Sequence, residues 1–347
     1  MEKLKISQQS FGEKATLFIL ENDNGYKLEV TDFGARVVNF MVPTQAGDKN
    51  IVLGFDSAEE YLEKDTYIGA TIGRVAGRIT KGQFEIDGTA YQVVTQPEHG
   101  NTLHGGPNSF EEVYWAAKPF EDERGVHVTF AYTSPDGENG FPGNLDVQVT
   151  YTLTNKNEWQ LNYEAKTDKA TLYNPTNHVY FNLTGDVTKP TDTHKLQVAA
   201  DKFVVVGDDT TATGEIRSVE NTPFDFQTAQ LMKQAYEADY EQNVLVDGLD
   251  HPFVFSKEAS KPQATIVAPD ESIRVEMTTT EPSVVIFTAQ FGEDAPVMRG
   301  QQLAQHGGIT LETQVLPGAV EFEGFGNIIL RPSEVFKSET VYKVIAD

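Results

Sequence analysis

Residues 145–165 read LDVQVTYTLTNKNEWQLNYEA, and apolar and polar side chains alternate through most of this stretch. The apolar positions before the polar segment TNKNE are Leu145, Val147, Val149, Tyr151 and Leu153. The apolar positions after it are Trp159, Leu161, Tyr163 and Ala165. Because successive side chains of a strand point to opposite faces, this pattern predicts two strands, each with one buried face. The polar segment predicts a turn, so the stretch is a long antiparallel hairpin.

The same alternation recurs along the rest of the chain. It is found at residues 26–42, 83–94, 125–133, 264–280, 283–290 and 327–344. Asp87 and Gly88 have the composition of a tight hairpin turn. Helical spacing is confined to two short stretches, SAEEYLEK at 57–64 and the region around TAQLMKQAYE at 228–237. Strands without helical crossovers favour an antiparallel sandwich over a parallel α/β sheet.

We therefore predict an all-β fold, a large antiparallel β-sandwich with few short helices. The chain has 347 residues, which is long for an average domain but within the range of large all-β folds. It contains no repeat of fixed period and no Pro/Gly/Ser-rich linker. We expect a single domain over residues 1–347.

Charge and composition restrict the partners. There are 27 Lys and Arg residues against 52 Asp and Glu residues, a formal net charge of −25. Such a field repels phosphate backbones and anionic lipid headgroups, so we expect no nucleic acid and no membrane as partner. A neutral small molecule such as a sugar is compatible with this charge.

The chain lacks cysteine, which excludes disulfides, thiolate nucleophiles and cysteine-ligated metal sites. Its first residues contain no apolar run long enough for a signal sequence or a membrane span. We expect a cytoplasmic protein. The nucleotide-binding glycine motifs, H-E-x-x-H and the G-x-S-x-G elbow are also missing from the sequence. Acid/base chemistry by histidines and carboxylates remains.

The seven histidines separate into two groups. His127 lies in a strand on the face opposite the apolar positions, and His99 and His194 lie in polar loops, so we interpret these three as surface residues. The other four lie where loops meet strands, at His104, His178, His251 and His306. Glycines beside some of them allow a ligand to approach closely, although they also serve simple turns.

Charged residues near these histidines complete the candidate set. Strict alternation in GITLETQ places Thr310, Glu312 and Gln314 on one face of a strand, which could equally be a solvated face. Asp250 precedes a His-Pro turn and could serve as a turn residue. Arg74 and Arg78 could each form a structural salt bridge. Residue by residue, these positions leave the structural and functional interpretations open.

Taken in order, a set of segments resembles the signature segments of the aldose 1-epimerase (galactose mutarotase) family. The segments are GRVAGRITKGQFEIDG (73–88), NTLHGG (101–106), NPTNHVYFNLTG (174–185), GLDHPFV (248–254), TTTEPSVVIFT (278–288), LETQVLPGA (311–319) and ILRPSEVFKSETVYK (329–343). The similarity extends from about residue 15 to the C-terminus. It implies a supersandwich fold with an open sugar-binding cleft. It also implies a cofactor-free reaction, without metal, that interconverts the α and β anomers of a free hexose such as galactose or glucose.

The resemblance also implies roles for individual residues. Glu312 matches the general base of the family and His178 its general acid. Arg78, His104 and Asp250 match sugar-binding residues, and Phe287 matches an aromatic residue of the pocket. Gly77 stands where many members have Asn, and the segment before His104 reads longer than in relatives. Both departures concern the choice of sugar.

Ring opening needs a base at the anomeric O1 hydroxyl and an acid at the ring oxygen O5. We expect partial desolvation to raise the pKa of Glu312 and a nearby carboxylate to keep His178 protonated near neutral pH. The partner is then a small-molecule sugar, and the protein acts as a monomer or a homodimer.

Other functions remain open on the residues alone. Hexose 6-phosphates would require clustered Lys and Arg, whereas a disaccharide such as maltose would require a larger cleft. A carbohydrate-binding module would have a vestigial acid/base pair. A metal-dependent hydrolase could use His104, His178, Asp250 and Glu312 as ligands, although their spacing matches no ligand motif.

Overall fold

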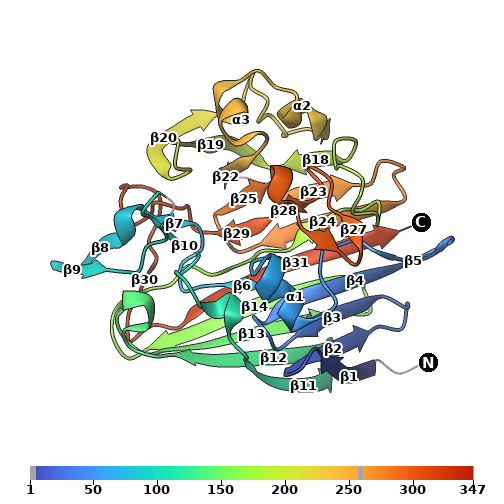
Figure 1. Ribbon diagram of the computed structural model, residues 1–347, viewed down its shortest axis with the longest axis horizontal. Helices are drawn as coiled ribbons and strands as arrows, with labels where there is room; N and C mark the ends of the chain where they lie inside the picture. The colour runs from blue at the N-terminus through green and yellow to red at the C-terminus, as the bar shows by residue number, and fades with distance from the viewer. Residues whose placement is uncertain (1–4, 98, 257–260, 347) are drawn as a thin grey trace.

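The computed structural model describes residues 5–97, 99–256 and 261–346. Three sheets build most of the fold, and β-strands dominate it (Figure 1). The largest sheet has nine strands in the order β11 (Ala116–Asp122), β12 (Gly125–Ser134), β13 (Leu145–Leu153), β14 (Glu158–Thr167), β31 (Phe336–Ala346), β24 (Ile273–Thr279), β23 (Ala264–Val267), β18 (Lys195–Val198) and β21 (Gln230–Leu231). Its neighbours pair antiparallel throughout. The expected antiparallel all-β fold is confirmed.

Two five-stranded sheets accompany the large one. The first has the order β1 (Lys5–Phe11), β2 (Ala15–Glu21), β3 (Lys27–Thr31), β4 (Arg36–Thr44) and β5 (Gly47–Asn50). The second has the order β20 (Ala212–Ser218), β19 (Ala200–Val206), β22 (Asp250–Phe255), β25 (Ser283–Phe287) and β29 (Glu312–Gln314). In Figure 1 the first lies at the lower right and the second at the upper left.

The described residues also form short two-stranded sheets. They are β7 (Arg78–Ile79) with β10 (Thr102–Leu103), β6 (Thr71–Ile72) with β16 (Thr176–Asn177), β17 (Tyr180–Phe181) with β28 (Ile309–Thr310), β15 (Thr171–Leu172) with β30 (Ile329–Leu330), β8 (Gln83–Ile86) with β9 (Thr89–Gln92), and β26 (Val297–Met298) with β27 (Gln301–Gln302). The α-helices in the described residues are α1 (Ala58–Lys64), α2 (Lys233–Tyr236) and α3 (Glu241–Val246). None of these helices is long and apolar enough to cross a membrane.

The predicted hairpin of residues 145–165 forms β13 and β14, which pair from Leu145 opposite Thr167 to Leu153 opposite Trp159. Its alternating apolar side chains are buried. The Asp87-Gly88 turn joins β8 to β9, and both residues have the positive φ that such a turn requires. The stretch 228–237 differs from the prediction, because Gln230 and Leu231 form strand β21 and only Lys233–Tyr236 is helical.

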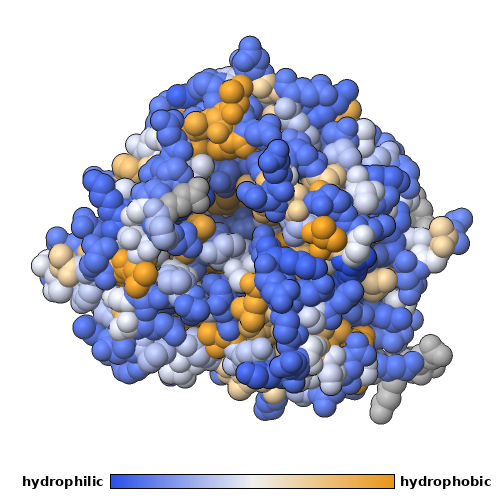
Figure 2. All heavy atoms as spheres, viewed as in Figure 1, coloured by the Kyte–Doolittle hydropathy of each residue, from blue (hydrophilic) through white to orange (hydrophobic). Residues whose placement is uncertain are grey.

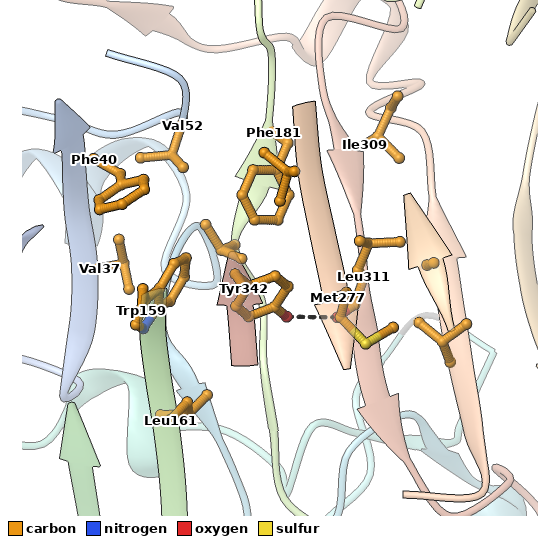
Figure 3. Packing of buried hydrophobic residues seen from close by; sticks show 14 of the residues in the cluster. Val37, Phe40, Val52, Trp159, Leu161, Phe181, Met277, Ile309, Leu311 and Tyr342 are labelled. Carbon is orange, nitrogen blue, oxygen red and sulfur yellow. Dashed lines mark hydrogen bonds between the residues drawn. The ribbon is translucent and has the colours of Figure 1, made fainter. Parts of the chain in front are cut away.

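A single large core joins the three sheets. Near its centre, the rings of Trp159 on β14 and Tyr342 on β31 lie with centroids 4.6 Å apart (Figure 3). The Tyr342 hydroxyl donates to the carbonyl of Leu311 at 3.0 Å. Leu311 directly precedes β29, so the core fixes the backbone from which Glu312 projects.

Candidate active site

A pocket opens where the ends of β7, β10, β22, β25 and β29 meet. It encloses about 830 Å³, counting its open mouth. Figure 2 shows a hollow on this face, near the position that β22 and β25 occupy in Figure 1. All six residues implied as site residues line it: Arg78, His104, His178, Asp250, Phe287 and Glu312. Residues from positions 78 to 312 of the chain therefore meet at one place.

Glu312 and His178 lie side by side in this pocket. The Nε2 atom of His178 is 3.5 Å from Oε1 of Glu312, and both side chains are at least nine-tenths buried. The hydroxyl of Thr310 donates to the same carboxylate oxygen at 3.0 Å. Thr310 and Glu312 thus share a face, as the alternation predicts, but that face is buried rather than solvated. A titratable carboxyl group and a titratable imidazole are thereby held next to each other.

The backbone of His178 is held by the segment that follows α1. The His178 N–H donates to the carbonyl of Ala70 at 2.9 Å, and the Gly69 N–H donates to the carbonyl of His178 at 2.9 Å. The preceding residue, Asn177, donates from its side chain to the carbonyl of Gly69 at 2.9 Å and to the Tyr151 hydroxyl at 3.0 Å. Strand β16 and the hydrogen bonds on both sides of His178 therefore fix the backbone from which its imidazole projects.

Aromatic rings surround the imidazole of His178. Tyr67 stacks on it with ring centroids 6.1 Å apart, and His104 meets it edge-on at 5.1 Å. Tyr67 also contacts the His104 ring, at 4.8 Å. Phe287 lines another wall of the pocket, close to Tyr180 and Phe291. These apolar surfaces remove water from the acid/base pair.

The hydrogen bonds of His104 decide whether this cluster fits a metal ion. His104, His178 and Glu312 each place a ligand-type atom within 4.8 Å of the others. However, the Gly77 N–H donates to Nδ1 of His104 at 3.2 Å, so Nδ1 carries no proton and the neutral ring is protonated on Nε2. Neither nitrogen of His104 then has a free lone pair for a metal. The ring instead offers an N–H donor, which suits a sugar oxygen.

Arg78 and Asp250 form the charged end of the pocket. The Nη1 atom of Arg78 lies 3.8 Å from Oδ2 of Asp250, and both side chains are partly exposed. At this distance the two groups attract each other and still have donor and acceptor positions available. They can therefore bind hydroxyl groups of a sugar, Arg78 as donor and Asp250 as acceptor.

Burial shifts the protonation of the central pair in opposite directions. Burial, assisted by the negative charge of Asp250, raises the pKa of Glu312 to about 8. Burial lowers the pKa of His178 to about 4, although the charge of Asp65 opposes this shift. The expected rise for Glu312 is confirmed. The expectation that a carboxylate keeps His178 protonated is wrong, because desolvation outweighs the attraction.

Several histidines differ from their sequence-based interpretation. His127 is buried rather than exposed, because its nitrogens contact Thr152 and Asp122 at 2.8 Å each. His194 is also buried, and its Nε2 accepts a hydrogen bond from the Leu183 N–H at 2.9 Å. His251 is buried against Gln242 on the far side of Asp250 from the pocket lining. His99 is exposed, as expected.

The structure also brings into the pocket polar residues to which the sequence interpretation gave no role in the site. Asp65, Tyr67 and Gln314 all line the pocket. The place of Gln314 in the pocket could be predicted from the sequence, because it lies two residues after Glu312 on the same strand. Asp65 and Tyr67 follow a short helix, and the sequence around them has no motif that indicates a site. Only the folding of the chain brings them into the pocket. Arg74 is structural, since its guanidinium donates to carbonyl and hydroxyl groups inside the protein.

Comparisons with known proteins show which family the chain resembles. Residues 16–343 match the family model described as aldose 1-epimerase. The chain is 33% identical over 342 residues to an aldose 1-epimerase of Escherichia coli K12, covering 97% of each chain. It is 36% identical over 339 residues to a galactose mutarotase of Homo sapiens, covering 96% of this chain and 95% of the relative.

Solved structures give the same result. A galactose 1-epimerase from Lactobacillus acidophilus NCFM matches with a TM-score of 0.89 and 29% identity, covering 99% of both chains. An aldose epimerase homologue from C. elegans matches with a TM-score of 0.87 and 28% identity, covering 96% of this chain and 99% of the other. The pocket that holds Glu312 and His178 therefore lies in a fold that these structures share.

Proposed function

The chain belongs to the aldose 1-epimerase family, and we propose that it interconverts the α and β anomers of a free hexose, such as galactose or glucose, with Glu312 as base and His178 as acid. The observation that carries this proposal is the 3.5 Å separation of His178 Nε2 and Glu312 Oε1 in one pocket. The two oxygens that exchange protons in mutarotation, O1 and O5, are bonded to the same carbon atom. A base and an acid that serve them must be close neighbours.

In the proposed reaction, the Glu312 carboxylate takes the proton of the O1 hydroxyl while the His178 imidazolium gives one to O5. The C1–O5 bond breaks and an open-chain aldehyde forms. Rotation about C1–C2 presents the other carbonyl face, and ring closure returns both protons. General acid and general base each contribute typically about 10²–10⁴-fold, which suffices for a reaction of this kind without a cofactor.

The pair works with one shared proton. With pKa values of about 8 for Glu312 and about 4 for His178, it holds one proton across neutral pH. The reactive arrangement places that proton on His178. Hydrogen bonds from sugar hydroxyls to Glu312 favour the carboxylate and thereby this arrangement. Arg78, Asp250 and the N–H of His104 would hold the remaining hydroxyls, and Phe287 would contact an apolar face of the sugar.

A neutral sugar suits the charge of the pocket. Among the described residues that line it, Arg78 alone carries a permanent positive charge, and Asp250 lies 3.8 Å from it. A sugar phosphate would require more cationic groups than this. We further propose that residues 1–347 act as one domain in the cytoplasm, with neither nucleic acid nor membrane as partner.

Polarimetry tests the proposal. Freshly dissolved α-D-galactose, α-D-glucose, maltose and a hexose 6-phosphate are followed with and without the protein, and with protein treated with a chelator. We expect a faster approach to the same final rotation for galactose or glucose, with no effect of the chelator. An unchanged rate on every sugar would refute the proposed function. Loss of activity after chelation would favour a metal-dependent reaction instead.

A further inference from the structure

Residues 65–70, between α1 and β6, hold the proposed acid. Gly69 and Ala70 form both backbone hydrogen bonds of His178. Tyr67 stacks on the His178 ring with centroids 6.1 Å apart. Asp65 begins the segment, and its side chain lines the same pocket as His178 and Glu312. The side chain of Asp65 has no part in the proton transfers described above. It therefore places a further carboxyl group in the pocket of the proposed acid, His178.

The carboxylate of Asp65 is fixed by the backbone. Its Oδ1 atom accepts hydrogen bonds from the N–H of Tyr67 at 2.8 Å and of Ile68 at 3.2 Å. Burial raises the pKa of Asp65 above its ordinary value, and the two N–H donors, together with the positive charge of His178 when it is protonated, oppose this shift. Behind the segment, the guanidinium of Arg36 donates to the carbonyls of Thr66 and Ile68 and holds this geometry. Asp65 is thus an oriented carboxyl group beside the proposed acid, and in its ionised form it is a fixed negative charge.

The other groups facing His178 do not supply the same charge. Those on surrounding elements are Glu312 on β29, Asp250 on β22, Arg78 on β7, and the neutral rings of His104, Tyr67 and Tyr180. Asp250 and Arg78 have opposite charges 3.8 Å apart, so their effects on His178 largely cancel. Glu312 is the group that must release its own proton to His178. Asp65 is the remaining carboxyl group, and its ionised form opposes the fall in the pKa of His178.

We propose that Asp65 is a positioning residue whose negative charge holds the shared proton on His178 in the reactive state. This inference rests on the proposed function, because it concerns the acid of that reaction. In the proposed reaction Asp65 neither gives nor takes a proton. It shifts the balance between the state with a neutral His178 and protonated Glu312 and the state with imidazolium and carboxylate.

Asp65→Asn separates charge from structure. The amide oxygen of Asn accepts the same two N–H hydrogen bonds, so only the charge is lost. We expect kcat to fall about 5- to 30-fold, the size of one partly screened charge interaction at close range. KM should stay within about twofold. The basic limb of the kcat–pH profile should move to lower pH, because the pair loses its proton more readily without the nearby negative charge.

Asp56→Asn is the matched control. It makes the same substitution and the same change in net charge, but Asp56 is exposed and pairs with Arg299 outside the pocket. Its pH profile should match that of the unsubstituted protein. If Asp65→Asn fails to fold, Asp65→Ser removes the charge and still offers an oxygen to the turn, with the same expected kcat and pH shift.

An Asp65→Asn protein with unchanged kcat and pH profile would overturn the inference and leave the proposed function intact. A raised KM with unchanged kcat would also overturn it, since Asp65 would then bind the sugar rather than tune the acid. If the unsubstituted protein accelerates mutarotation of no sugar, the proposed function fails and this inference fails with it.

Discussion

Burial of Glu312 and His178 in contact with each other determines their chemistry more than either residue type does. Desolvation penalises the charged form of both, so the carboxyl retains a proton to unusually high pH and the imidazole loses its proton at unusually low pH. The pair is then a reservoir for one proton. Mutarotation needs one proton delivered and one removed at each step, so a one-proton pair remains competent after every turnover.

This protonation leads to a bell-shaped pH dependence. Below about pH 4, His178 is protonated in addition to Glu312, so the pair holds two protons and no base remains. Above about pH 8, Glu312 loses the pair's proton and no acid remains. After subtraction of the uncatalysed rate, kcat/KM for galactose should therefore be highest between these limits. A catalysed rate that still rises above pH 9 would contradict the one-proton pair.

The elements that carry the site residues are short, and contacts with neighbouring elements hold them in place. Strand β29 spans only Glu312–Gln314, and it is positioned by pairing with β25 and by the Tyr342 hydroxyl on Leu311. Helix α1 precedes the segment that holds His178. Its N-terminus is capped by Ser57, whose Oγ accepts from the Glu60 N–H at 3.3 Å, and by Glu60, which accepts from the Asp56 N–H at 2.9 Å.

Ser57→Ala should lower the free energy of unfolding by about 1 kcal/mol, since it leaves a helix N–H without its acceptor. Urea unfolding measures the change. Ser10→Ala, on the exposed strand β1, is the control and should alter stability by less than about 0.5 kcal/mol. If Ser57→Ala is as stable as this control, the cap contributes nothing to α1.

Alternation predicted the long strands because each has one face in the core and one outside. β13 and β14 are of this kind, and the Asp87-Gly88 turn also has a purely local cause. Helix α3 was not predicted, since its six residues include the exposed apolar side chains of Val244 and Leu245 and show no amphipathic pattern. The exposure of His127 was predicted wrongly because Phe120 and Asp122, both on the edge strand β11, cover the outer face of its strand.

The site was predicted by resemblance rather than by spacing. Glu312, His178, Arg78, His104, Asp250 and Phe287 lie in six separate segments, and no local period connects them. The fold brings them into one pocket, together with Asp65 and Tyr67. The residue types indicated acid/base chemistry and a raised pKa for Glu312, but only the packing shows that burial lowers the pKa of His178.

For the whole molecule, the dominant property is a formal net charge of −25. A field of this sign leaves a neutral sugar unaffected and repels anions. The kcat/KM for galactose should therefore change by less than about twofold between about 20 and 300 mM NaCl, while thermal stability rises as salt screens the self-repulsion. A steep salt dependence of kcat/KM would indicate that the substrate is charged.

The most direct test of the acid/base pair is the mutarotation rate of α-D-galactose with the Glu312→Gln protein. Glu281→Gln is the matched control, because burial raises the pKa of Glu281 to about 7 but its side chain lies outside the pocket. We expect Glu312→Gln to lose about 10²- to 10⁴-fold in kcat, the contribution of a general base, while Glu281→Gln keeps its activity. A Glu312→Gln protein that retains more than about one tenth of the kcat would contradict the assignment of Glu312 as the base.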